Sequence, residues 1–208
     1  METMAPPAPS YLKALETGIL QRRVNHGLEA LADCTLCPRG CGVNRTAGET
    51  GICETGRHAV VASYNAHFGE ETPLVGRNGS GTIFFSHCSL RCNFCQNYEI
   101  SHLGEGRAVA DDQLAAIMLE LQQAGCHNIN LVSPSHVVPQ ILAAVHLAAQ
   151  RGLVVPLVYN CSGYDRVETL KLLDGIVDIY MPDFKFWHPN VARDTCNAPD
   201  YLELAKHA

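Results

Sequence analysis

Apolar and polar positions follow two rhythms through the second half of the chain. Short apolar runs predict strands at 82–86, 129–133, 153–160 and 176–181, the third beginning after Pro156 because proline cannot donate to a central ladder. Helical spacing predicts a helix capped by Asp111 and Asp112 and ended by Gly125, then helices at 137–150, 166–173 and 200–207. This alternation indicates right-handed βαβ units and a parallel sheet.

The pattern before residue 82 is less regular. An apolar stripe over 11–32 predicts one helix, or two shorter ones because Gly18 and Gly27 interrupt it. A strand is predicted at 60–68, and the glycine-rich stretch 76–81 matches neither phosphate-binding fingerprint and predicts a turn. We expect three parts: an N-terminal helix (1–33), a cysteine-rich metal-binding segment (34–75) and the βα region (76–208).

The expected fold class is α/β, a partial (β/α) barrel preceded by the cysteine-rich segment. Four parallel strands cannot close a barrel of eight, and the last strand is left as an open edge. Two arrangements remain: an open half-barrel protected by the N-terminal segment, or a shortened version of a longer protein.

Composition and charge narrow the function classes. The chain has 208 residues, of which 47% are hydrophobic, and a net charge of −6 without a cluster of lysine or arginine. This balance argues against nucleic acid as the main partner. The longest apolar stretches, 152–159 and 175–182, are too short to span a bilayer, and 1–10 does not have the pattern of a signal peptide. We therefore expect a cytoplasmic protein that does not enter the membrane.

Cysteine is the unusual residue of this chain. There are ten, and seven of them fall into two tight groups. In a small secreted protein such a density indicates disulfides, but this chain is long and shows no export signal. Reduced thiolates that bind metal are the better interpretation.

The second group is a C-x3-C-x2-C motif formed by Cys88, Cys92 and Cys95, directly after a predicted strand. Three thiolates so close together suit a [4Fe–4S] cluster, each binding a different iron and leaving the fourth open to a substrate. Ligands also gather at the carboxyl ends of parallel strands. A zinc site completed by a remote residue, or buried thiols without metal, are the alternatives.

At these residues the sequence resembles the radical S-adenosylmethionine superfamily, and within it the pyruvate formate-lyase activating enzyme-like proteins. The resemblance covers roughly residues 30 to 205, although the chain is expected to lack the C-terminal part of these relatives. It is carried by the stretches 34–41, 81–85, 88–98, 128–132, 159–164 and 178–185.

The resemblance implies a mechanism and partners. A reduced [4Fe–4S] cluster would pass one electron to bound S-adenosylmethionine, giving methionine and a 5′-deoxyadenosyl radical that abstracts a hydrogen atom. A protein substrate and a reductant such as flavodoxin or ferredoxin are the further partners it implies. The alternative function is an iron–sulfur electron-transfer or metal-binding protein, or an inactive fragment, without radical chemistry of its own.

The resemblance also implies cofactor-binding residues. Phe94 matches an aromatic position near the adenine, with a core aromatic as its ordinary interpretation. Ser133 stands where many relatives carry a Gly-Gly-Glu motif for the methionine amino group. Asn160, Asp183 and Lys185 match positions beside the carboxylate of S-adenosylmethionine and a monovalent cation. Asn160 replaces a carboxylate there, and an exposed ion pair is the alternative for Asp183 and Lys185.

The first cysteine group consists of Cys34, Cys37, Cys41 and Cys53. Four thiolates at short spacings with interleaved glycines suit a closed site for Zn²⁺ or for a second [4Fe–4S] cluster, and the spacing does not separate these two. Cysteines without metal are the third interpretation.

The remaining cysteines are scattered. Cys161 lies near the expected site, whereas Cys126 and Cys196 are expected to be ordinary. His87 and His136 follow predicted strands, and we expect both to pack or hydrogen-bond rather than to catalyse.

Overall fold

Six strands form a single sheet in the order β3-β1-β2-β4-β5-β6 in the computed structural model, which describes residues 8–208. Strands β2, β4, β5 and β6 run parallel, as the βαβ pattern predicted, while β1 is antiparallel to β2 and β3 antiparallel to β1. The fold is therefore α/β with a mostly parallel sheet. The strands are β1 Ala59–His67, β2 Ser80–Phe85, β3 Arg107–Val109, β4 Ile129–Val132, β5 Leu157–Cys161 and β6 Ile179–Pro182.

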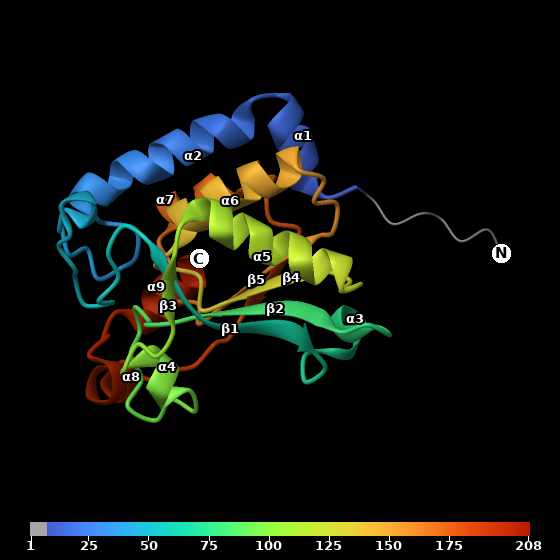
Figure 1. Cartoon of the computed structure of the whole chain (residues 1–208). Coiled ribbons are helices and arrows are strands. Elements are labelled where there is room, and N and C mark those ends of the chain that lie inside the picture. Colours follow the sequence, from blue (N-terminus) through green and yellow to red (C-terminus); the bar gives the residue numbers. More distant parts are fainter. Residues whose placement is uncertain (1–7) are drawn as a thin grey trace.

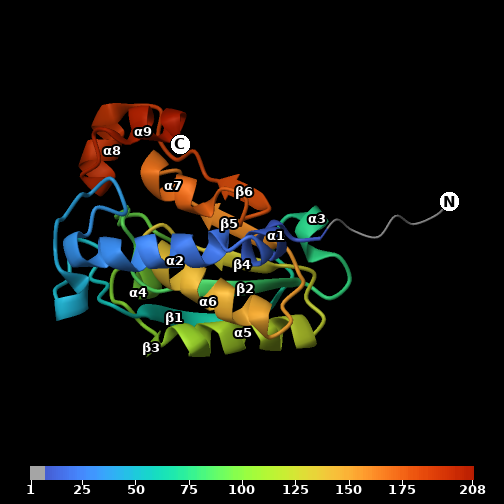
Figure 2. The same ribbon diagram turned by 90° about the horizontal axis from the view of Figure 1, so that it is seen from above.

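The helices that follow the central strands lie on one face of the sheet. Helix α5 contacts β1, β2 and β4, and α6 packs beside α5. Helix α2 forms an outer layer on α6 (Figure 1), and Figure 2 shows the two helices from above. The helices are α1 Ser10–Glu16, α2 Ile19–Glu29, α3 Thr72–Val75, α4 Tyr98–Ser101, α5 Asp111–Gln123, α6 Val138–Gln150, α7 Val167–Leu173, α8 Pro189–Cys196 and α9 Tyr201–His207, with 3-10 turns η1 Ala30–Asp33 and η2 Arg45–Ala47.

The first predicted helix is two helices, as the glycines allowed. The chain turns between α1 and α2 at Gly18, whose φ of +70° is in the left-handed region that glycine adopts without a steric penalty. Gly27, by contrast, stays helical inside α2, where it lies against Pro139 of α6. The first seven residues of the proposed segment 1–33 lie outside the described part of the chain.

Three local predictions were wrong. Asp111 and Asp112 do not cap α5, because Ala110 is the N-cap residue and its N–H donates to Oε1 of Gln113 at 2.9 Å. Asp111 instead forms an ion pair with Arg57 at 2.6 Å. The predicted turn at 76–81 is too long, since its last two residues belong to β2, and β6 starts at 179 rather than 176. Helices α3, α4 and α8 and strand β3 were not predicted.

The main apolar core lies between the sheet and these helices. Ile83 and Leu131 from the strands, Leu114 and Met118 from α5, and Leu142 from α6 have no exposed surface. No helix among residues 8–208 has both the length and the apolar character needed to cross a membrane.

The two edges of the sheet differ. Strand β1 covers the outer side of β2, and β3, which follows β2 in the chain, pairs with the outer side of β1, so β2 is not an edge strand. At the other edge β6 has one strand partner, β5, among the described residues. Ile179 and Tyr180 are 38% and 44% exposed there. The sheet is open in the way that a partial barrel requires.

Truncating a core side chain tests this layered packing. Leu142→Ala should lower the free energy of unfolding by about 2–5 kcal/mol, because the side chain is fully buried between α6 and its neighbours. Chemical denaturation measures the change. Leu103→Ala, at a side chain that is 64% exposed, is the control and should stay within about 0.5 kcal/mol of the wild type. Equal losses in the two variants would contradict the assigned packing.

Candidate functional site

The carboxyl ends of the four parallel strands lie along one edge of the sheet, and the register of the strands aligns the residues that follow them. Val132 of β4 pairs with Asn160 of β5, and Asn160 pairs with Met181 of β6. Backbone hydrogen bonds extend the alignment past the strands, since the Ser133 N–H donates to the Asn160 carbonyl at 3.0 Å and the Asp183 N–H to the Cys161 carbonyl at 2.9 Å. Side chains from distant parts of the sequence therefore meet at this edge.

A cavity of about 460 Å³ lies at this edge. Its volume is in the range of pockets that hold small molecules. All three cysteines of the triad and all five residues expected to bind a cofactor line it, although they come from the loops or ends of four different strands. These residues are Cys88, Cys92, Phe94, Cys95, Ser133, Asn160, Asp183 and Lys185.

The triad loop leaves β2 through an uncommon backbone. His87 and Arg91 have φ of +67° and +51°, values that non-glycine residues rarely adopt and that concentrate at functional sites. This path folds the loop back on itself, and the Cys95 N–H donates to the Cys92 carbonyl at 3.1 Å. The Cys88 sulfur accepts hydrogen bonds from the N–H groups of Leu90 and Arg91. Burial raises the pKa of the Cys88 thiol, and these two hydrogen bonds oppose that shift.

The donor set around the cavity fits a [4Fe–4S] cluster. No three His, Cys, Asp or Glu side chains within residues 8–208 are arranged to hold a single metal ion. A cubane cluster makes a different demand, because each thiolate binds its own iron. Three sulfurs that line one cavity, with backbone N–H groups directed at Cys88, meet that demand.

Lys185 brings positive charge to the triad. Its Nζ lies 2.9 Å from Oδ2 of Asp183, and the lysine side chain is the more buried of the two. Burial would lower the pKa of Lys185, but the hydrogen bond and charge of Asp183 outweigh it and raise that pKa. The Lys185 charge in turn favours the thiolate forms of Cys88 and Cys92, which metal binding requires.

Two other predicted residues have conformations that suit ligand contact. Phe94 is 57% exposed, so it is not a core aromatic, and its ring meets Phe186 edge-on with 5.9 Å between centroids. Ser133, directly after β4, has a φ of +59°, which non-glycine residues rarely adopt outside functional sites. Both side chains border the cavity without belonging to the core cluster.

Arg39 of the first cysteine group joins the triad loop to the C-terminal helices. Its Nε donates to the Ser89 carbonyl at 2.8 Å and its Nη2 to the Leu90 carbonyl at 3.1 Å. Its Nη1 and Nη2 reach the carbonyls of Asn197 and Cys196, both at 2.6 Å. These carbonyls end helix α8, where a positive charge is favourable. One guanidinium therefore holds three separate segments in place.

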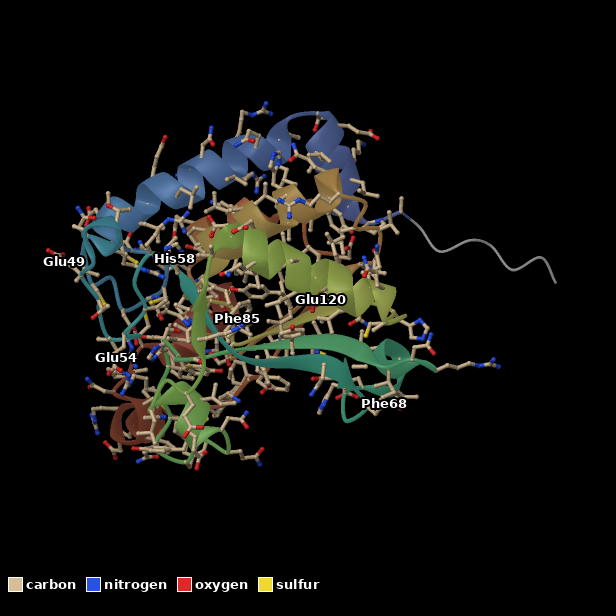
Figure 3. The ribbon with its side chains drawn as sticks, in the orientation of Figure 1. Glu49, Glu54, His58, Phe68, Phe85 and Glu120 are labelled. Carbon is tan, nitrogen blue, oxygen red and sulfur yellow. The ribbon has the colours of Figure 1, made fainter. Side chains whose placement is uncertain are left out.

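The first cysteine segment contacts the triad loop at a second point. Glu54, labelled in Figure 3, forms an ion pair with Arg91 at 2.9 Å. The Arg91 Nη1 also donates to the carbonyl of Ile52 at 3.3 Å. Since Cys53 lies between Ile52 and Glu54, the two cysteine groups are linked through their own loops.

Sequence reasoning missed residues supplied by the C-terminal helices. Cys196, expected to be ordinary, shares a hydrogen bond with Cys92, and this bond followed by burial raises the pKa of Cys92. Tyr201 of α9 is fully buried, and its hydroxyl donates to the Ser162 carbonyl at 2.7 Å and accepts from the Lys185 N–H at 2.8 Å. No spacing in the sequence signals either contact. Cys161 lines the cavity, as its position near the site suggested.

The two histidines have supporting contacts. The His136 Nε2 donates to the Ser86 carbonyl at 3.0 Å, and the ring is buried. Burial and then the nearby Arg45 charge lower the pKa of His136 to about 3, so the ring stays neutral near pH 7. His87 lies 3.8 Å from Glu54, and neither histidine is among the residues lining the cavity.

Comparison with known proteins identifies the region that contains this site. Residues 82–208 match the Radical SAM superfamily. An uncharacterized protein of Methanocaldococcus jannaschii is 28% identical over 201 residues, covering 94% of this chain and 58% of that protein. The chain thus spans little more than half the length of this relative. No solved structure matches the chain at a significant level.

Removing the Arg39 guanidinium tests its role in joining the three segments. Arg39→Gln should lower the free energy of unfolding by about 2 kcal/mol, because four carbonyl oxygens lose a charged donor. Urea denaturation measures the effect. Arg39→Lys should recover little, since one ammonium group cannot replace a planar fork. The control is Arg193→Gln, at an exposed residue paired with its neighbour Asp194, and a similar loss there would contradict the assignment.

The low pKa of His136 predicts a pH dependence of stability. Between pH 6.5 and about 3 the unfolded chain binds a proton at this ring and the folded chain does not. The contribution of His136 is therefore complete above pH 6.5 and is lost as pH falls. Near pH 5 the free energy of unfolding should depend on pH less steeply in His136→Gln than in the wild type, by about 1 kcal/mol per unit. An equal slope in the two proteins would contradict the low pKa of this ring.

Proposed function

Since this chain belongs to the radical SAM superfamily, we propose that it is an enzyme that cleaves S-adenosylmethionine reductively at a [4Fe–4S] cluster held by Cys88, Cys92 and Cys95. The observation that carries the proposal is the cavity of about 460 Å³ at the carboxyl ends of the parallel strands, which is lined by the three thiols and by polar side chains at or just after the ends of β4, β5 and β6. An electron-transfer protein needs only ligands for its cluster. Polar side chains that line the same cavity as the thiols are what a bound substrate requires in addition.

The proposed division of labour follows from where each group lies. Cys88, Cys92 and Cys95 would hold the cluster, which would supply the electron for splitting S-adenosylmethionine into methionine and a 5′-deoxyadenosyl radical. Lys185 offsets the negative charge of the thiolates and stays protonated because of Asp183. Phe94 offers an exposed aromatic face beside the third cysteine for the adenine ring. Ser133 and Asn160 present side-chain oxygen and nitrogen at the strand ends for the polar end of the same molecule.

We propose further that the chain acts as an activating-enzyme-like oxidoreductase in the cytoplasm, with a protein substrate and a flavodoxin- or ferredoxin-type reductant. The support is the resemblance of stretches such as 159–164 and 178–185 to the pyruvate formate-lyase activating enzyme-like proteins. The proposed parts 1–33, 34–75 and 76–208 would then be a helical cover, a metal-binding segment and the catalytic region. Strand β1 of the second part pairs with β2 of the third, so these parts share one sheet.

Detection of 5′-deoxyadenosine tests the proposed reaction. The full chain is reconstituted without oxygen with iron and sulfide, reduced with dithionite and given S-adenosylmethionine. We expect 5′-deoxyadenosine from the wild type and none above background from Cys92→Ala, because that variant loses one of the three cluster thiolates. Cys126→Ala, at a buried cysteine outside the cavity, should retain the activity.

The same experiment has a contradicting outcome. A wild-type protein that binds about four irons at the triad and shows the absorption of a cluster, yet yields no 5′-deoxyadenosine, would refute the proposed reaction. It would leave an electron carrier or an inactive fragment as the function of this chain.

A further inference from the structure

Four thiols gather in the loop that precedes β1. Cys34, Cys37 and Cys53 are buried and Cys41 is half-buried. Gly51, two residues before Cys53, lies directly against the Cys41 side chain, so the two ends of the loop meet. A bridge between Cys34 and Val43 closes the loop, with the Cys34 N–H donating to the Val43 carbonyl at 3.0 Å. Nothing in the proposed cleavage of S-adenosylmethionine uses these cysteines.

Arg45 lies beside this group with its charge buried and unpaired. Its side chain is 1% exposed, and within residues 8–208 it forms no ion pair with a carboxylate. Its Nε donates to the Gly56 carbonyl at 2.9 Å, and its Nη1 to the His136 carbonyl at 2.8 Å and towards the Cys34 sulfur at 3.7 Å. Its Nη2 has no hydrogen-bond partner in the part of the chain that the structure describes. A buried, uncompensated guanidinium is costly, so a negative charge is expected next to it.

The neutral thiols of the group do not supply that charge. Four thiolates on a divalent ion, or on a [4Fe–4S] core of charge 2+, carry a net charge of 2− after four protons have left. Such a centre would neutralise Arg45 and give Cys34 the sulfur charge that accepts its hydrogen bond. A metal bound to the four thiolates would thus account for the burial of the arginine charge beside the four cysteines.

Two backbone features shape the loop around Cys41. The Ile52 N–H donates towards the Cys41 sulfur at 3.5 Å, as amides do around metal-bound thiolates. Gly51 approaches so closely that a Cβ there would lie 2.6 Å from this sulfur and 2.8 Å from the Cys41 Cβ. Only glycine leaves this sulfur where it is.

We propose that Cys34, Cys37, Cys41 and Cys53 bind a tetrathiolate metal centre of net charge 2−, and that Arg45 is its buried counter-cation. A [4Fe–4S] cluster satisfies this chemistry with each thiolate on its own iron, whereas a single Zn²⁺ would require the sulfurs to draw closer, because no three of the described side chains are arranged around one ion. The inference goes beyond the proposed function, because it requires neither S-adenosylmethionine nor the triad.

The centre has a structural consequence for the triad. Arg39 lies two residues after Cys37 and holds the triad loop and the end of α8, while Ile52 and Glu54, on either side of Cys53, bind Arg91. A metal that orders the first loop therefore also orders both anchors of the second. Losing it should loosen the triad loop without removing a triad ligand.

Metal content of a variant without the triad tests the proposal directly. In the full chain carrying Cys88→Ala, Cys92→Ala and Cys95→Ala, any tightly bound metal belongs to another site. This protein is incubated either with Zn²⁺ alone or with Fe²⁺ and sulfide under anaerobic conditions, desalted and analysed for both metals. About one zinc per chain, or about four irons with cluster absorption, supports the proposal and distinguishes its two forms.

Substituting a cysteine of the first group tests whether the retained metal is bound there. Adding Cys37→Ala should abolish the retained metal, whereas adding Cys126→Ala should not. Retained metal that survives Cys37→Ala would overturn the proposal. So would the absence of bound metal from a triad-free protein whose circular dichroism shows it to be folded. Neither result depends on 5′-deoxyadenosine, so failure of the proposed function remains a separate finding.

Matched variants test the counter-cation and the tight approach. Arg45→Met should weaken metal affinity about 10- to 100-fold in competition with a chelator, and Arg45→Lys should recover part of it by restoring the charge. Gly51→Ala should also weaken binding, while Gly56→Ala, with nothing within 4 Å of the new Cβ, should not. Arg22→Met is the exposed control for Arg45. Affinity that is unchanged in Arg45→Met would overturn the role given to this arginine.

Discussion

The in-register parallel pairing of β2, β4, β5 and β6 is the constraint on which the site depends. Parallel strands in register end together, and their following residues then share one edge of the sheet. The pairs Phe84 with Val132, Val132 with Asn160, and Asn160 with Met181 set this alignment. A slip of one residue in any strand would turn its side chains to the opposite face and remove one wall of the cavity.

Arginines outside the sheet then hold the loops that the strands cannot hold themselves. The Arg39 guanidinium donates hydrogen bonds to four carbonyls of the triad loop and the end of α8. It also lies over the Tyr164 ring, 5.2 Å from the centroid. Arg166, the N-cap residue of α7, donates to the Thr35 carbonyl, and Thr169 of α7 donates to the Leu36 carbonyl. The first cysteine segment is thereby attached to the triad loop and to α7. Loops need this support, because they lack the ladder hydrogen bonds of a sheet.

Much of the fold was predictable because long apolar patterns dominate the local energetics. The strands β1, β2, β4 and β5 and the helices α5, α6, α7 and α9 lie close to their predicted positions, and the break at Gly18 matches one of the two alternatives left open. Three of the missed elements are short: β3, α3 and α4 have three, four and four residues, too few for a period to emerge. Asp111 was misread as a cap because its partner Arg57 is remote in sequence, so the competing ion pair was invisible.

Some features of the candidate site were likewise predictable from the sequence, and others were not. The sequence by itself determined the two cysteine groups, the strand ends that follow one another through the chain, and the resemblance to a superfamily to which residues 82–208 belong. Close spacing places thiols together regardless of the rest of the fold. Only the tertiary structure decided that Cys196 meets Cys92, that Tyr201 ties Ser162 to Lys185, and that Arg45 is buried with no carboxylate paired to it among residues 8–208. Such contacts join residues far apart in sequence, and their energies depend on burial and charge that exist only once the chain has folded.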